Sequence, residues 1–221
     1  MQYELLDSGV AKISLDNGKV NAVSVDLSQA LIESLARAQS EAKAVLICGH
    51  PGMFCAGFDL RVVAQGMDVA MAMFEQGMHL LERLYSHPQP VIVACEGHAI
   101  GMGVFLLLAS DYRVGAEGDY TFKLPETELG MPFPPTLKIL AKTHIDARYH
   151  SRTIIQSNAY DGKMAASIGM LDEVVVQTEV MDKAMTVAER LAQLPAEQYK
   201  TNKLDIRSAE IEAIRQSLNL S

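Results

Sequence analysis

Two short apolar runs, each followed by a glycine-containing segment, constrain the fold of this chain more than any other feature. The runs are residues 44–48 (AVLIC) and 91–95 (VIVAC). Apolar side chains at every position, rather than at alternate positions, are typical of strands that are covered on both faces. A helical pattern over residues 67–85 lies between the two runs, as a crossover between parallel strands requires. The sequence therefore predicts a layered α/β core built from βαβ units.

Further elements are expected on both sides of these runs. Apolar and polar residues alternate over 2–15 as in one or two strands, and residues 111–114 and 120–122 are further strand candidates. The pattern beyond Pro135 is largely helical, over 136–142, 147–157, 162–169 and 178–194, and 171–176 is either a strand or a packed connector. We expect one folding unit, with an α/β core over 1–140 and a helical part over 141–221 that serves packing or oligomerisation.

Composition excludes several classes of function. Of the 221 residues, 49% are hydrophobic and 21% are charged, which is typical of a globular chain rather than a disordered one. The net charge of −8 gives no general attraction to nucleic acid. The cysteines form no CxxC pair, and the histidines form no metal-binding grouping. Because neither a signal peptide nor a membrane-spanning run is present, we expect a cytoplasmic protein with no membrane partner and no metal.

Two glycine-containing segments follow the apolar runs and are interpreted as turns. They are residues 51–60 (PGMFCAGFDL) and 96–103 (EGHAIGMG). In an open parallel sheet, ligands bind beyond the carboxyl ends of the strands, where glycine lets backbone N–H groups approach a ligand oxygen. Two such groups that converge on one oxygen form an oxyanion hole, which stabilises an enolate. Each segment alone is equally an ordinary tight turn, and neither fits a GxGxxG motif or a P-loop.

Taken together, several segments resemble the crotonase superfamily, the enoyl-CoA hydratase/isomerase family. The resemblance rests on residues 19–23 (KVNAV), 54–60 (FCAGFDL), 97–103 (GHAIGMG), 109–113 (ASDYR) and 125–130 (PETELG), and more weakly on 165–174. It implies a crotonase-like fold and an acyl-CoA thioester as the substrate, with no cofactor beyond the coenzyme A of the substrate itself. It also implies a homotrimer or a dimer of trimers, although the helical C-terminal part is shortened relative to the family pattern.

The resemblance also assigns an oxyanion hole. It implies that the backbone N–H groups of Ala56 and Met102 bind the thioester oxygen of the substrate. The family pattern usually has glycine at the position of Met102. A backbone donor survives this change, but the methionine side chain narrows the space beside the thioester.

The family's acid–base positions distinguish between reactions. Hydratases of the family carry two glutamates that hold a water, and here the first position is Phe105 and the second is Glu126. A single carboxylate is enough to move a proton from C2 to C4 of a 3-enoyl-CoA, and an apolar neighbour raises its pKa toward the range of a proton shuttle. The pattern therefore favours a 3-enoyl-CoA to 2-enoyl-CoA isomerase. The alternatives are a hydratase or another lyase, and a non-catalytic acyl-CoA binding protein.

Each candidate side chain also has a structural interpretation. Glu126 is alternatively a capping or surface carboxylate, and Glu128 is a weaker rival for its role. His98 is expected to make a structural hydrogen bond, Cys55 to pack in the core, and the methionine-rich stretch 67–78 to line either an acyl pocket or the core. Asp59 opens the helix after the first turn and is expected to cap it. The resemblance implies that Lys19 meets the phosphates of coenzyme A. The candidate substrate-binding set is Lys19, Phe54, Gly57, Phe58, Asp59, Leu60, Gly101 and Phe105.

Overall fold

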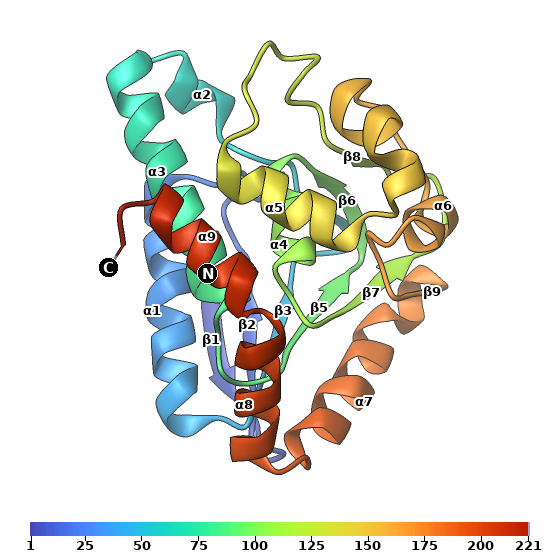
Figure 1. Ribbon diagram of the computed structural model, residues 1–221. Coiled ribbons are helices and arrows are strands. Elements are labelled where there is room, and N and C mark those ends of the chain that lie inside the picture. The colour runs from blue at the N-terminus through green and yellow to red at the C-terminus, as the bar shows by residue number, and fades with distance from the viewer. Residues whose placement is uncertain (221) are drawn as a thin grey trace.

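A six-stranded sheet forms the centre of the computed structural model, which describes residues 1–220 (Figure 1). The strand order is β1-β2-β3-β5-β7-β9; β1 is antiparallel to β2 and every other pair is parallel. Both predicted apolar runs are strands of this sheet and are buried at every position. The strands are β1 (Gln2–Leu5), β2 (Val10–Ser14), β3 (Ala44–Cys48), β5 (Val91–Cys95), β7 (Tyr112–Ala116) and β9 (Glu173–Val175).

A second, three-stranded sheet occupies the segments that the sequence presented as turns. Its parallel strands are β4 (Gly52–Cys55), β6 (Gly97–Ile100) and β8 (Phe122–Lys123). The prediction of simple turns was therefore wrong for the start of both segments. Gly52 pairs with Gly97, and a Cβ added to Gly97 would lie 2.0 Å from the carbonyl carbon of Gly52. The absence of a side chain at Gly97 thus allows β4 and β6 to pair closely.

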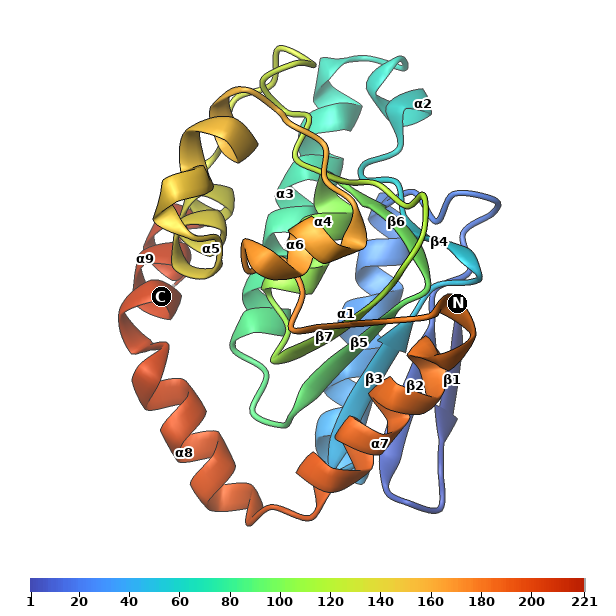
Figure 2. The same ribbon diagram turned by 90° about the vertical axis from the view of Figure 1, so that its right-hand side faces the viewer.

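Helices cover both faces of the large sheet (Figure 2). Side chains at alternate positions of β3, such as Val45 and Ile47, belong to the core under α1 (Val25–Glu41) and α3 (Met67–Tyr85). The intervening positions of the same strand pack against α7 (Val180–Ala192). The predicted α/β core with helical crossovers is therefore confirmed. The remaining helices are α2 (Leu60–Val63), α4 (Met102–Leu108), α5 (Pro135–His144), α6 (Gly162–Ser167), α8 (Ala196–Ile206) and α9 (Ser208–Ser217).

The predicted helix over 147–157 departs from regular α geometry. It consists of a 3₁₀ turn, Ala147–Tyr149, followed by a π-helical turn, Ser151–Ile155. A further 3₁₀ turn, Gln177–Glu179, precedes α7. Within residues 1–220, no helix combines the length and the apolar character needed to cross a membrane.

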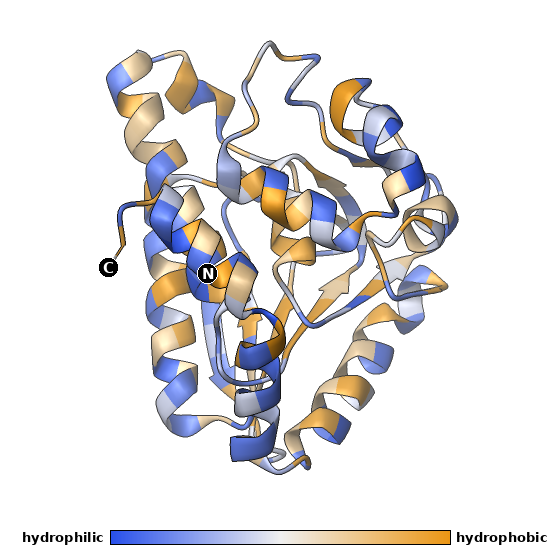
Figure 3. Cartoon of the chain, viewed as in Figure 1, coloured by the Kyte–Doolittle hydropathy of each residue, from blue (hydrophilic) through white to orange (hydrophobic). Residues whose placement is uncertain are grey.

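The two final helices are held to the core by buried ion pairs. Helix α8 is mostly hydrophilic, in contrast to the apolar strands (Figure 3). From this helix, Lys203 Nζ lies 2.6 Å from one carboxylate oxygen of Asp111, and the guanidinium of Arg207, between α8 and α9, lies 2.8 Å from the other. From α9, Arg215 pairs with the buried Glu82 of α3 at 2.8 Å. Charge pairing, together with the buried Ile211 and Ile214 of α9, therefore fixes the C-terminal helices in place.

Candidate active site

The segment after β4 is hydrogen-bonded to a segment that lies more than thirty residues earlier. Ala56 N–H donates to the Val20 carbonyl at 3.0 Å. Val23 N–H then donates to the Gly57 carbonyl at 2.7 Å, and Asp59 N–H donates back to the Val23 carbonyl at 3.0 Å. These bonds fix the backbone from Ala56 to Asp59 and decide which N–H groups remain available to a ligand.

The available donors differ in part from those expected. The prediction for Ala56 was wrong, because its N–H is already bound to a backbone carbonyl. The N–H of Phe58 lies between two bonded positions of this ladder, and within residues 1–220 it has no acceptor. The N–H of Met102, at the first position of α4, also has no acceptor there, as expected for the first residue of a helix. The site thus offers Phe58 and Met102 as backbone donors.

These two donors belong to segments that lie against each other at Gly57. Gly57 has a φ of +93°, and a Cβ there would lie 3.0 Å from the Ile100 carbonyl oxygen and 3.6 Å from Met102 N. Only glycine combines this backbone conformation with such a close approach. The side chains of Phe58 and Met102 also lie close to the same residue of α3, Gly77. A Cβ on Gly77 would lie 2.6 Å from the Phe58 ring and 3.5 Å from Met102 Cε. The donors are therefore neighbours in space.

Glu126 places a buried carboxylate beside this pair. Its side chain is 7% exposed, and its Oε2 atom has no hydrogen-bond partner within the described chain. Its Oε1 lies 3.4 Å from the point that a Cβ on Gly101, the residue before Met102, would occupy. Burial raises the pKa of this carboxyl to about 7. A hydrogen bond from the backbone N–H of Glu126 itself acts in the opposite direction and lowers the pKa. The alternatives of a surface or capping carboxylate do not fit these surroundings.

Glu128 and Phe105, the other two residues considered for the acid–base chemistry, have surroundings that differ from those of Glu126. Glu128, the rival carboxylate, is exposed and pairs with Lys123 at 2.5 Å. Phe105 lies one turn along α4 from Gly101 and is fully buried, with its ring edge-on to Phe133 at a centroid distance of 6.0 Å. An aromatic pair thus occupies the position at which the family's hydratases are expected to carry a glutamate.

The remaining predicted substrate-binding residues are scattered. Phe54 is fully buried in the core, whereas Lys19 and Leu60 are exposed. Asp59 accepts a hydrogen bond from Arg61 N–H at 2.9 Å and forms an ion pair with the same residue, which holds the pKa of the carboxyl below its usual range. Its predicted role as a helix cap is therefore confirmed.

The structural interpretations of the other candidates hold as well. His98 Nδ1 accepts a hydrogen bond from Thr121 N–H at 2.9 Å, so the histidine has the predicted structural bond. Cys55 is buried, and its burial raises the pKa of the thiol to about 12, which keeps it unreactive. In the methionine-rich stretch, Met73 is buried whereas Met67 is largely exposed, so these side chains do not form one continuous lining.

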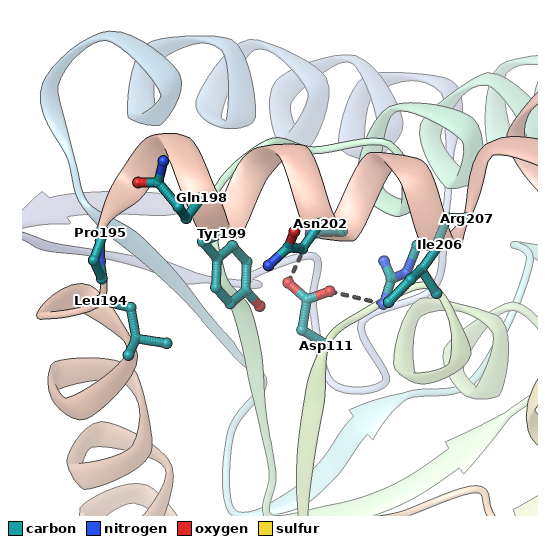
Figure 4. Close-up of a pocket in the computed structure, with 9 residues that line it drawn as sticks. Asp111, Leu194, Pro195, Gln198, Tyr199, Asn202, Ile206 and Arg207 are labelled. Carbon is teal, nitrogen blue, oxygen red and sulfur yellow. Dashed lines mark hydrogen bonds and ion pairs between the residues drawn. The ribbon is translucent and has the colours of Figure 1, made fainter.

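A separate cavity of about 460 Å³ lies between α8 and the start of β7 (Figure 4). The carboxylate of Asp111 points toward α8 and is paired with Lys203 and Arg207, and Leu194 and Ile206 also line the cavity. None of the residues around Glu126 lines this cavity. Among residues 1–220, no group of three or more His, Cys, Asp or Glu is arranged to hold a metal ion.

Comparison with known proteins shows the family to which the chain belongs. The profile of the family described as enoyl-CoA hydratase/isomerase matches residues 6–218, and the chain belongs to this family. A solved enoyl-CoA hydratase/isomerase family protein from Pseudomonas syringae is 35% identical, with a TM-score of 0.94 over 98% of this chain and 94% of that chain. The predicted crotonase-like fold is thereby confirmed.

Two further relatives extend the comparison, and the first of them has been given both an isomerase and a hydratase name. A Mycobacterium tuberculosis protein, solved once as an enoyl-CoA isomerase and once as a probable enoyl-CoA hydratase, is 32% identical, with TM-scores of 0.92 and 0.93. Both structures cover 99% of this chain, which spans 95% and 92% of theirs. The human peroxisomal bifunctional enzyme is 28% identical over 94% of this chain, which spans 28% of the length of that relative.

Proposed function

We propose that this protein isomerises 3-enoyl-CoA to 2-enoyl-CoA with Glu126 as its single acid–base residue. The observation that carries the proposal is the state of Glu126: a buried carboxyl that has no side-chain partner among residues 1–220 and a pKa of about 7. A group with such a pKa both accepts and returns a proton near neutral pH, which a proton shuttle between two carbons requires. The family assignment and the isomerase name of one relative support the same chemistry.

The reaction follows from the placement of the donors. The N–H groups of Phe58 and Met102 bind the thioester oxygen of the substrate. Glu126 removes a proton from C2, and the resulting negative charge moves onto that oxygen as an enolate. Glu126 then delivers the proton to C4, which shifts the double bond to the 2-position. Each backbone donor contributes about 3 kcal/mol of transition-state stabilisation in sites of this kind.

Phe105 makes the site more suitable for isomerisation than for hydration. Addition of water requires a group that holds the nucleophile as well as one that moves a proton. The buried Phe105 ring offers no hydrogen bond to a water, and it packs against another aromatic ring. The site therefore favours transfer of a proton over addition of water.

Two other functions have specific support. A hydratase or another lyase is supported by the hydratase names among the relatives, and a non-catalytic acyl-CoA binding protein by the phenylalanine at position 105. Purified protein assayed separately with a 3-enoyl-CoA and with a 2-enoyl-CoA distinguishes the three. We expect the double bond of the first substrate to migrate, without hydration of the second. Hydration would favour the lyase, and thermal stabilisation by the esters without turnover would favour the binding protein.

Other parts of the proposal concern the setting of the reaction. We propose an acyl-CoA thioester as the ligand, with no metal and no cofactor besides its own coenzyme A, and a role for the exposed Lys19 near the coenzyme A phosphates. We also propose a cytoplasmic homotrimer or dimer of trimers. Sedimentation of the purified protein measures the assembly, and activity after dialysis against EDTA tests the absence of a metal requirement.

A further inference from the structure

Among residues 1–220, no other side chain forms a hydrogen bond with the carboxylate of Glu126. Its Oε2 has no hydrogen-bond partner within the described residues, and the only donor to the carboxylate is the backbone N–H of Glu126 itself. The charged side chains of the same loop, Lys123 and Glu128, pair with each other, and burial alone raises the pKa of Glu126. The position of this carboxylate must therefore be set by the backbone that carries it.

That backbone forms a closed turn. Leu129 N–H donates to the Pro125 carbonyl at 2.9 Å, and Met131 N–H donates to the Glu126 carbonyl at 2.8 Å. At the start of the turn, the Pro125 ring lies 3.6 Å from the point that a Cβ on Gly101 would occupy. These contacts define the shape of the turn, but only the proline contact ties it to the rest of the site.

Two further hydrogen bonds hold the other side of the turn. The Thr127 hydroxyl donates to the Ile154 carbonyl at 3.0 Å, and the Glu128 N–H donates to the Ser157 hydroxyl at 3.4 Å. The two residues that directly follow Glu126 are thus anchored to one short segment, residues 151–157. Apart from these bonds, the exposed residues 127–130 are tied to the protein by the ion pair between Glu128 and Lys123 of β8.

The anchoring segment has an unusual backbone. Ser151–Ile155 is a π-helical turn, and Ser157 has a φ of +53° although it is not glycine and is only 4% exposed. Both features are energetically unfavourable and tend to occur at functional sites. The segment is in turn held by a hydrogen bond between the Thr153 hydroxyl and the Tyr160 hydroxyl at 3.0 Å. Of this segment, Thr153 and Ser157 are buried, so the Ser157 hydroxyl that accepts the bond from the loop belongs to a side chain held inside the protein.

We propose that Thr127 and Ser157 are positioning residues that hold the Glu126 carboxylate in place for proton transfer. The proposal rests on the proposed function, in which Glu126 moves the proton. Neither residue touches the donors of the site, so both act through the backbone of the loop. Proton transfer demands close placement of the shuttle, and a displacement of about 1 Å lowers rates by as much as 10²-fold.

Kinetics of matched variants test the proposal first. Thr127→Val and Ser157→Ala remove the two hydroxyls with little change of volume. We expect kcat for isomerisation to fall by roughly 10–100-fold in each, with KM within about twofold of the original value. Thr127→Ser, which keeps the hydroxyl, should restore most of kcat. The controls Thr186→Val and Ser167→Ala remove hydroxyls that bond backbone carbonyls on exposed helix surfaces, and they should leave kcat unchanged.

Ser157→Gly distinguishes the effect of the Ser157 hydroxyl from the effect of its strained backbone conformation. Glycine accepts the positive φ without strain but lacks the hydroxyl. If the hydrogen bond to Glu128 is what matters, Ser157→Gly will lose as much kcat as Ser157→Ala even where it raises the thermal stability. A Ser157→Gly enzyme with full kcat would overturn the role assigned to the hydroxyl.

Titration of Glu126 itself provides a readout that does not need activity. The infrared band of the protonated carboxyl, taken as the difference from the matching Glu126→Gln protein, gives its apparent pKa in each background. A loosened loop lets water reach the carboxylate, so we expect this pKa to fall from about 7 in Thr127→Val and in Ser157→Ala. Folded variants with unchanged kcat and unchanged titration would overturn the proposal. An inactive original protein would refute the proposed function alone, and the titration would still decide whether the hydroxyls position Glu126.

Discussion

The carboxylate of Glu126 lies against the backbone of Gly101, with its Oε1 3.4 Å from the point that a Cβ on that glycine would occupy. Gly101 immediately precedes Met102, whose N–H has no acceptor within residues 1–220. The carboxylate proposed to move the proton therefore lies against the residue next to one of the proposed oxyanion donors. This relationship makes the geometry of the glycine-containing segments as important for the reaction as the glutamate itself.

Gly57→Ala is expected to damage both stability and catalysis. The new Cβ would lie 3.0 Å from the Ile100 carbonyl oxygen on a backbone with a φ of +93°, and the positive φ alone costs roughly 1–2 kcal/mol. Relief of the contact separates Phe58 from Met102, so kcat should fall by about 10²–10³-fold, the effect of losing one oxyanion donor. Thermal unfolding and isomerase kinetics measure the two effects.

Gly18→Ala is the matched control for this variant. Gly18 also has a positive φ, of +71°, but a Cβ there would meet nothing within 4 Å. It should lose a similar amount of stability and keep its kcat. If the two variants lost kcat to the same extent, close packing at Gly57 would not be what brings the donors together.

Replacement of Glu126 by glutamine should stabilise the protein at high pH. The pKa of Glu126 is raised from 4.5 to about 7 in the folded state, so the folded state is penalised as pH rises through this range and the carboxyl ionises. At pH 8, Glu126→Gln should therefore raise the free energy of unfolding by up to about 3 kcal/mol, whereas at pH 4.5 the gain should vanish. Urea unfolding at the two pH values measures the difference. An equal effect at both would show that the carboxyl is solvated in the folded protein.

Two buried histidines should make the fold sensitive to acid. Burial lowers the pKa of His87 to about 4 and that of His144 to about 3, from an ordinary value of 6.5. Their contribution to stability is fully present above pH 6.5 and is lost as pH falls toward the folded values, by about 2 kcal/mol per histidine at pH 5. Unfolding at pH 7 and at pH 5 should show that His144→Phe removes part of this loss. A pH dependence identical to that of the original protein would contradict the assignment.

The ion pair between Lys203 and Asp111 should be needed to hold the C-terminal helices. Lys203→Met leaves Asp111 buried with Arg207 as its remaining charged partner, and removing one member of a buried pair is strongly destabilising. We expect a loss of about 3 kcal/mol in the free energy of unfolding, measured with urea. Changing Asp111 to Asn in the same protein should recover part of the loss. No recovery would mean that the lysine acts by packing alone.

The sequence predicted the central elements well because their signals are local. The fully apolar runs of β3 and β5 and the period of α3 need no knowledge of distant residues, and their bounds were predicted closely. The glycine-containing segments were harder to interpret, because four-residue strands such as β4 and β6 are recognisable only once their pairing is known. Short strands without alternation leave no periodic signal.

The identity of one backbone donor in the proposed oxyanion hole also depends on residues that are distant in sequence. The motif around Gly57 predicted a backbone donor at Ala56, and this assignment was wrong because the N–H of Ala56 is already bonded. Which N–H is available depends on the Val20 carbonyl, 36 positions before Ala56, which accepts the N–H of that residue and leaves the N–H of Phe58 free. In contrast, the site's carboxylate could be found from sequence, since Phe105 leaves Glu126 as the remaining acid at the two matched positions.

The most direct test of the central claim is the rate of double-bond migration in Glu126→Gln. Glutamine keeps the shape of the side chain and cannot carry the proton from C2 to C4. With a 3-enoyl-CoA as the substrate, we expect kcat to fall by roughly 10²–10⁴-fold, while the affinity for a non-reactive acyl-CoA, measured by calorimetry, changes little. A Glu126→Gln protein that isomerises the substrate at nearly the original rate would contradict the account, because the proton would then be carried by another group.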